Sequence, residues 1–411
     1  MSCRRPPVLY TLCAVELLER LAGNLLAALL LFFLTERLQL PVGDATRLIG
    51  GFHALSYALA ILGGWLADRY LGSGRTVGAG LGLLTVGYLT LMVQERSMAL
   101  AGLALLVVGH GLFKPNITAL FGEVYPAGDT RRERAYRLFY LVINVGTVLG
   151  PILGALVAAR AGWSAAFTVA GAALAVASLL FWLTSGSRTL TPVVAAANSS
   201  GAMAAVPVVH RPAYGHLLRL LIGVVLFEGA MNQSASTLLL FARDYTRREV
   251  GRLALPPALF ASLPALFALI ITPLAALRPR ETSSSLSVAA RLRSLARSPL
   301  CGLGAYGLLA FATTAHPGRV SALWLASSLF ILTLGELYLY GRGLALLGEL
   351  VPGVRGSLVY GLWFVASALG QWLSGQLGVF YARGQPCDFF LLFVGLEAVA
   401  VMVLVPLRQG K

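Results

Sequence analysis

Charged residues are scarce in this sequence. Only 12% of its 411 residues are charged and 57% are hydrophobic, with a mean hydropathy of +0.78. Soluble domains carry about 25% charged residues, so the composition excludes an ordinary soluble protein and indicates an integral protein of the lipid bilayer. The net charge is +15, but no soluble stretch is long enough to form a folded basic face, which excludes nucleic acid as a partner.

Residue patterns that bind metals or nucleotides are also lacking. The four cysteines are scattered and form no CxxC pair, so we expect no metal site, redox centre or disulfide framework. No GxxxxGK(S/T) phosphate loop is present. Gly78, Gly80 and Gly82 lie within an apolar run and are poor candidates for such a loop. We therefore expect no cofactor, no metal and no enzymatic activity.

Long hydrophobic runs are abundant. They lie at 10–34, 46–67, 76–94, 98–122, 135–158, 163–184, 217–241, 256–277, 300–315, 321–348, 356–381 and 388–407. About 20 apolar residues suffice to cross a hydrocarbon layer of roughly 30 Å. The segment 185–213, rich in Ala, Ser, Pro and Val, reads as a linker. The pattern predicts an all-α membrane protein of twelve transmembrane helices, with one six-helix bundle in 1–184 and another in 214–411.

Arginines are unevenly divided between the two sides of this predicted arrangement. With the N-terminus inside, the cytoplasmic loops hold more arginines than the opposite loops, although four lie in the outer segment 243–252. Positive residues favour the cytoplasmic side, so we expect both termini in the cytoplasm and a bacterial inner membrane as the location. The segment 285–295 alternates aliphatic residues with arginines and predicts a structural amphipathic helix on the membrane surface.

Three charged residues interrupt the first run. Glu16, Glu19 and Arg20 are spaced so that they share one helical face, and each costs about 2.5–3.5 kcal/mol inside a membrane. A signal peptide is excluded because the charges break its apolar region and no small-residue cleavage site follows. Two alternatives stay open: a buried structural ion pair, or a path for ions or polar solutes, which we favour.

Lys114 and Glu336 are further ionisable residues within predicted spans. Pro115 follows Lys114 and frees a backbone carbonyl, which can bend the helix and open space around the lysine. The ammonium group needs an anion, either a protein carboxylate in an internal salt bridge or a ligand carboxylate. Glu336 can be a proton site, an amine receptor or a neutral structural residue. His53 and His110 can titrate near neutral pH, but we expect both to be packed and neutral.

A loop motif closes the second run. Residues 64–75 read Gly-Trp-Leu-Ala-Asp-Arg-Tyr-Leu-Gly-Ser-Gly-Arg, and an Asp beside arginines can form a charge clasp between helix ends. This loop resembles the signature of the major facilitator superfamily. Further motifs are similar to those of the proton-dependent oligopeptide transporter (POT) family, and they cover nearly the whole chain. They are ExxER at 16–20, YxxxxxGG at 57–64, GLFKPNI at 111–117, FYLVINVG at 139–146, NQSAS at 232–236, GEL at 335–337 and GLWFVASALG at 361–370.

The resemblance implies a proton-coupled symporter that imports small zwitterionic solutes, foremost di- and tripeptides, by alternating access of two halves. It implies a monomer driven by the proton gradient. Proton coupling would fall to Glu16, Glu19, Arg20 and Glu228. Substrate binding would fall to Arg20, Tyr57, Lys114, Asn144, Asn232, Gln233 and Glu336, and the conformational latch to Gly64, Asp68, Arg69 and Arg75. Arg20 and Lys114 would receive the substrate carboxylate and Glu336 its ammonium group.

Interhelical contacts are the alternative for the neutral polar residues. Tyr57 and Asn144 can form ordinary hydrogen bonds between helices instead of binding a peptide carbonyl. Gly146, Gly150 and Gly154, spaced by four, indicate close helix packing rather than ligand contacts.

Several positions depart from the family's pattern. Where aromatic residues and another Arg are usual after ExxER, the chain has Gly23, Asn24 and Ala27. Asn232 stands where a Glu is frequent, and Glu228, one turn earlier, can substitute for it. In the tenth run the usual Ser-Pro is replaced by Tyr340 and Gly341, followed by Arg342. These departures leave two competing hypotheses: a transporter of nitrate or an organic acid, and a transport-inactive sensor or scaffold.

Overall fold

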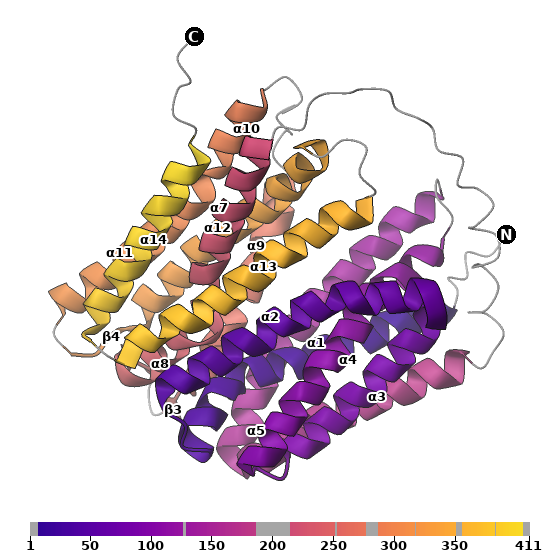
Figure 1. Ribbon diagram of the computed structural model, residues 1–411. Coiled ribbons are helices and arrows are strands. Elements are labelled where there is room, and N and C mark those ends of the chain that lie inside the picture. The colour runs from indigo at the N-terminus through magenta and orange to yellow at the C-terminus, as the bar shows by residue number, and fades with distance from the viewer. Residues whose placement is uncertain are drawn as a thin grey trace. The chain divides into compact units, whose positions relative to one another are not determined.

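The computed structural model describes residues 7–125, 129–185, 214–250, 253–276, 287–316, 318–350, 356–382 and 384–405. Nearly all of these residues are helical (Figure 1). The chain forms two compact units, one made of Met1–Leu29 with Leu55–Val206 and the other of Leu30–Ala54 with Pro207–Lys411. Apart from its first residue, Ser185, the predicted linker lies outside the described residues.

The helical elements follow one another with short connections. The first part of the chain contains α1 (Pro7–Phe32), η1 (Phe33–Arg37), α2 (Val42–Leu66), η2 (Ala67–Leu71), α3 (Ser73–Leu91), α4 (Arg96–Glu123) and α5 (Thr130–Ser185). The second contains α7 (Tyr214–Met231), η3 (Asn232–Ala235), α8 (Thr237–Asp244), η4 (Pro257–Ser262), α9 (Leu263–Ala276), α10 (Val288–Leu295), α11 (Arg297–Ala315), α12 (Ala322–Leu350), α13 (Gly356–Gly378), η6 (Val379–Ala382) and α14 (Pro386–Leu404).

Four strands of two residues each complete the described structure. They are β1 (Thr246–Arg247), β2 (Glu249–Val250), β3 (Leu253–Ala254) and β4 (Val320–Ser321). β1 pairs with β4 in parallel, with Thr246 opposite Val320. β2 and β3 form an antiparallel pair. These short ladders fasten the connections after α8 and before α12, and Thr246 and Val320 of the parallel pair are buried.

Apolar helices long enough to cross a membrane account for most of the fold. Nine such stretches occur among the described residues: Val8–Arg37, Val42–Leu71, Arg96–Glu123, Arg134–Thr184, Tyr214–Asp244, Pro257–Leu274, Val288–Ala315, Ala322–Leu347 and Pro386–Leu404. They confirm the predicted all-helical membrane protein at this coarser level. α3 and α13 lie over the predicted runs 76–94 and 356–381 but are not among the nine.

The longest stretch contains a break. Gly162 has φ 81° and ψ 177° inside α5, so the helix is interrupted there. This left-handed φ is open to glycine without steric cost. The break falls between the predicted runs 135–158 and 163–184, and each arm of α5 is long enough to cross a bilayer by itself.

Glycines allow close helix contacts within the first unit. A Cβ atom on Gly63 of α2 would lie 2.0 Å from the carbonyl oxygen of Gly111 in α4. On Gly146 it would lie 2.7 Å from Arg20 Cβ, and on Gly150 2.5 Å from the carbonyl oxygen of Leu21 in α1. The prediction that this glycine series serves helix packing is therefore confirmed. The contacts bring α1, α2, α4 and α5 close around the charged face of α1.

The second unit uses the same device. A Cβ on Gly370 of α13 would lie 2.4 Å from Glu228 Cβ in α7, and one on Gly335 of α12 would lie 3.2 Å from Phe227 Cε2 in α7. These approaches place α7, α12 and α13 beside one another, in agreement with their mutual contacts (Figure 1). Glu228 and Glu336 are carried on two of these three helices.

A short helix precedes α11. α10 is capped by Ser287, whose hydroxyl accepts a hydrogen bond from the backbone N–H of Ala290, and its Leu292 and Leu295 are buried while Arg293 is exposed. The predicted amphipathic helix at 285–295 is thus confirmed for its described part, which begins at Ser287, and its position on the membrane surface stays a prediction.

Candidate functional site

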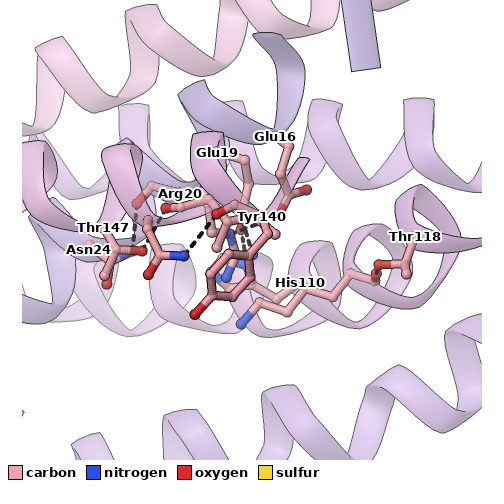
Figure 2. Close-up of polar contacts among 11 residues, drawn as sticks. Glu16, Glu19, Arg20, Asn24, His110, Thr118, Tyr140 and Thr147 are labelled. Atoms are coloured by element: carbon pink, nitrogen blue, oxygen red, sulfur yellow. Dashed lines mark hydrogen bonds and ion pairs between the residues drawn. The ribbon is translucent and has the colours of Figure 1, made fainter. Parts of the chain in front are cut away.

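The charged face of α1 forms a compact ion-pair cluster. Arg20 Nε lies 3.1 Å from Glu16 Oε1, and Arg20 Nη2 contacts Glu19 Oε2 (Figure 2). Both carboxylates are buried, with Glu16 4% and Glu19 1% exposed. Two carboxylates thus share one guanidinium, whose planar fork suits this geometry. Such pairing offsets much of the desolvation cost of the three charges.

A histidine from α4 completes the cluster. His110 Nδ1 lies 3.1 Å from Glu19 Oε1, and the residue is buried, with 5% exposed. Figure 2 shows the side chain beneath the α1 cluster. From the sequence, His110 was expected to be packed and neutral, and no role in this cluster was predicted for it. The available signal was its position one helical turn before Lys114, which puts both residues on the same face of α4.

Lys114 has a different environment. Its Nζ lies 5.6 Å from the centroid of the Tyr57 ring, a cation–π distance, and the residue is only partly buried. It forms no ion pair with any carboxylate of the described residues, whereas Arg20 of the same unit is paired twice. The described residues therefore show no internal salt bridge to Lys114. The ammonium group stays available to an anion.

Pro115 and Asn116 shape the helix around Lys114. A proline at 115 leaves the carbonyl of Gly111 without its helical donor, and that carbonyl faces Gly63 of α2. The Asn116 side-chain amide donates to the carbonyl oxygens of Gly63 at 3.1 Å and Leu112 at 2.8 Å. The KPN motif thus joins α4 to α2 beneath the lysine.

The neutral polar residues of this unit bind backbone atoms. The Asn144 side-chain amide donates to the carbonyl oxygen of Tyr140 at 2.8 Å, and the residue is buried. Asn24 donates to the Arg20 carbonyl at 2.7 Å and lies 3.3 Å from Thr147 Oγ1 in α5 (Figure 2). Asn24, one of the positions after ExxER that depart from the family's pattern, therefore connects α1 with α5.

The second unit contains a carboxylate cluster around Glu228. Asn232 Nδ2 donates to Glu228 Oε2 at 2.9 Å and to its carbonyl oxygen at 2.7 Å. The Tyr340 hydroxyl of α12 donates to Glu228 Oε1. Tyr340 was noted from the sequence only as a departure from the family's pattern. Its side chain supplies a hydrogen-bond donor to the buried Glu228 carboxylate.

Glu336 lies one turn before Tyr340 on α12. It is partly buried, and it forms no hydrogen bond or ion pair with the described residues. Glu228 is close enough to act on it electrostatically. Two neighbouring carboxylates without an intervening protein cation form a negative site that would favour a bound cation.

Gln233 is fully buried and bonded within the protein. Its Nε2 donates to the carbonyl oxygen of Ser374 at 2.8 Å and contacts Ser374 Oγ at 2.9 Å. Its Oε1 accepts from the hydroxyls of Thr237 at 2.6 Å and Ser236 at 3.3 Å. The amide thus joins η3, α8 and α13.

The residues of the predicted latch lie at the end of α2 and the start of α3. Asp68 and Arg69 belong to η2, Arg75 to α3, and all three are exposed. Arg69 lies 5.9 Å from the centroid of the Tyr70 ring. Gly64 faces Pro115, because a Cβ there would lie 3.9 Å from Pro115 Cβ. Within the described residues Asp68 forms no ion pair.

Comparison with known proteins relates this arrangement to a family. Residues 74–193 match the model of the POT family. The peptide transporter YePEPT of Yersinia enterocolitica is 27% identical, over 96% of this chain and 93% of that protein. The chain is thus similar to proteins of the POT family. Dipeptide and tripeptide permease A of Escherichia coli K12 is 26% identical, over 92% of this chain and 85% of the permease.

Solved structures of POT proteins share the fold. A peptide transporter POT in complex with sulfate has a TM-score of 0.84 at 24% identity, covering 97% of this chain and 94% of that one. A POT family transporter in complex with 5-aminolevulinic acid has a TM-score of 0.84 at 20% identity, covering 97% and 95%. The chain is thus an integral membrane protein of a transporter family.

Proposed function

We propose that this chain is a POT family member and a proton-coupled symporter that imports di- and tripeptides. One observation carries the proposal: Arg20 is held by two carboxylates while Lys114, in the same unit, has no ion pair within the described residues. Arg20 can be released when its carboxylate partners are protonated, and it lies in the same unit as Lys114, which is already available to an anion. Relatives named as peptide transporters and peptide permeases support peptides as the solute.

The proposed mechanism starts at the α1 cluster. Protonation of the Glu16/Glu19 pair removes the negative charge that holds Arg20, so the guanidinium can bind a substrate carboxylate together with Lys114. Because the two carboxylates are coupled, the proton belongs to the pair rather than to one residue. Release of the substrate and proton on the inner side restores the Glu–Arg pairs.

The ammonium end of the substrate would be received in the second unit. Glu336 is the proposed partner, since it is accessible, forms no ion pair among the described residues and lies in the field of Glu228. Glu228, which Asn232 and Tyr340 hold, is proposed to contribute to proton coupling. Asn144 and Tyr57 remain proposed substrate contacts. Gln233 is proposed to act indirectly, by positioning α7.

The proposed architecture is that of alternating access. We propose twelve transmembrane helices in two six-helix halves, 1–184 and 214–411, joined by a cytoplasmic linker at 185–213. The loop containing Gly64, Asp68, Arg69 and Arg75 is proposed to latch one conformation. The protein would act as a monomer in a bacterial inner membrane, with both termini in the cytoplasm and the proton gradient as the only energy source.

Uptake into proteoliposomes tests the proposal. A labelled dipeptide should accumulate under an imposed inward pH gradient, and unlabelled di- and tripeptides should compete for uptake. Competition by nitrate or organic acids without competition by peptides would identify an anion transporter instead. Ligand binding without flux would identify a sensor.

Glu19→Gln tests the coupling step separately. The neutral amide removes the charge that protonation would neutralise, so proton-driven accumulation should be abolished while counterflow exchange of dipeptide persists. Accumulation that survives the substitution would show that Glu19 is not part of the coupling pair.

A further inference from the structure

We propose that His110 and Glu19 form one proton-holding pair, in which uptake of a proton by the imidazole loosens Arg20 from Glu19. This inference rests on the proton-coupled transport proposed above. It assigns a role in coupling to a residue of α4 that belongs to neither the ExxER motif nor the KPN motif.

The geometry around Glu19 carries the inference. His110 Nδ1 lies 3.1 Å from Oε1, and Arg20 Nη2 contacts Oε2, so each carboxylate oxygen has its own nitrogen partner. Glu19 is 1% exposed and His110 is 5% exposed. A buried carboxylate between two nitrogen groups interacts electrostatically with both, and such interactions are stronger where water is excluded.

The tautomer follows from this contact. Proximity of Nδ1 to a carboxylate oxygen assigns the N–H of a neutral imidazole to Nδ1 and leaves Nε2 as the site of proton uptake. A proton bound at Nε2 changes the charge of the pair from −1 to zero while the Nδ1 contact stays in place. Electrostatically this equals protonation of Glu19 itself, so the attraction of the pair for Arg20 falls in both cases.

Charged groups on α1 and α4 surround the pair. Arg20 from α1 and Lys114 from α4 repel an imidazolium, and Glu19 attracts it. Further titratable groups nearby include Glu16, Tyr57 of α2 and Tyr88 of α3, whose hydroxyl donates to the Ala22 carbonyl at 2.8 Å. One proton enters the pair from the outer side and the same proton leaves to the inner side, so the stoichiometry of transport is unchanged.

Gly23 provides the space for the pair. A Cβ on Gly23 would lie 3.9 Å from both Glu19 Oε1 and His110 Cε1, in ordinary van der Waals contact with each. Alanine would therefore fit, whereas a long side chain would have to occupy the region next to the contact. Gly23, one of the positions after ExxER that depart from the family's pattern, thus lies beside the contact between Glu19 and His110.

The test is the pH dependence of proton-driven dipeptide uptake in proteoliposomes. His110→Asn keeps a side-chain donor but cannot take up a proton, so the midpoint of the pH profile should shift by about one unit or more. His53→Asn is the matched control, because His53 also lies in an apolar helix but packs against Phe52, with ring centroids 5.0 Å apart. Its midpoint should stay at the value of the native chain.

Two outcomes would overturn the inference or its basis. An unchanged midpoint in His110→Asn, with or without lower uptake at every pH, would reduce His110 to a structural residue. A native chain without any gradient-driven uptake would overturn the proposed function instead. Counterflow exchange shows whether the variant is folded, and Gly23→Leu should shift the midpoint in the same direction as His110→Asn, whereas Gly23→Ala should not.

A spectroscopic measurement avoids substitution of the pair. In a chain whose other four histidines are replaced by asparagine, infrared difference spectra on acidification should show an imidazolium band from ring-labelled His110. A carboxylic-acid band from Glu19 without that imidazolium band would place the proton on the carboxylate alone and overturn the inference.

Discussion

At the scale of single residues, the ionisable side chains inside the apolar helices are bound in two ways. Arg20 is bound by two carboxylates of its own helix, whereas Glu228 is bound by neutral donors, Asn232 and Tyr340. An ion pair loses its attraction when its carboxylate is protonated. Neutral hydrogen-bond donors keep their contact with a carboxyl group over a wide pH range. The two units therefore differ in how strongly protonation should change their contacts.

Tyr340→Phe removes one donor from Glu228 and leaves the aromatic ring. Loss of a hydrogen bond to a buried charged group costs about 1.5–3 kcal/mol, so the variant should unfold at a lower temperature in detergent and show reduced proton-driven uptake. Tyr338→Phe is the control, because the Tyr338 hydroxyl accepts from Arg297 and Arg342 and does not contact Glu228. Equal uptake in the two variants would contradict a role of Tyr340 in holding Glu228.

Lys114→Gln removes the cation that has no ion pair in the described structure. A dipeptide should then bind about 10–100-fold more weakly, as expected for a lost charge-assisted contact. The amide of the same dipeptide, which has no carboxylate, should lose much less affinity. Inhibition of counterflow measures both affinities. Equal losses for the acid and the amide would exclude Lys114 as the carboxylate receptor.

At the scale of helices, the positions of glycines decide which faces meet. Gly63 and Gly111 bring α2 against α4, and the series from Gly146 brings α5 against α1. Each contact lies next to a functional side chain: Lys114 follows Gly111, and Gly146 lies against Arg20. Close backbone contact thus fixes the positions of charged groups whose own side chains are long and flexible.

Gly63→Ala and Gly64→Ala form a matched pair of adjacent substitutions. The added methyl group at 63 would lie 2.0 Å from a backbone oxygen, but at 64 it would lie 3.9 Å from Pro115 Cβ. Overpacking costs about 1–3 kcal/mol or more, so only the variant at 63 should lose thermal stability in detergent. A similar loss in both variants would show that an added methyl group destabilises α2 by some effect other than contact with Gly111.

At the scale of the whole molecule, the sequence and the described helices agree that the chain is embedded in a membrane. The nine apolar stretches among the described residues and the match to POT family members along more than 90% of the chain lead to the same class of protein. The excess of arginines in alternate loops predicts the proposed orientation, with both termini in the cytoplasm.

Reporter fusions test this orientation. Alkaline phosphatase, which is active only outside the cytoplasm, should be active when fused after Gln94 and inactive when fused after Gly72, since one predicted span separates the two positions. A fluorescent protein fused after Lys411 should fold and fluoresce in the cytoplasm. The opposite pattern would reverse the assigned topology.

Much of this protein could be predicted from its sequence because the signals are local. Apolar length, helix-breaking glycine at 162 and the spacing of Glu16, Glu19 and Arg20 are properties of single segments. The i,i+4 pairing of Glu16 with Arg20 needed no knowledge of other helices. The lipid environment strengthens such signals, since every backbone polar group must be satisfied within its own helix.

Only the tertiary structure decided which side chains from different helices meet. The contact of His110 with Glu19 and that of Tyr340 with Glu228 join residues about 90 and 112 positions apart, and no periodicity encodes such a pair. Glycines such as Gly63 and Gly146 set how closely the helices approach and how they are rotated, and this decides which side chains are in contact. The sequence determined that charges are buried in the membrane helices, and the packing determined which partner each charge has, because pairing in three dimensions depends on the distances between helices.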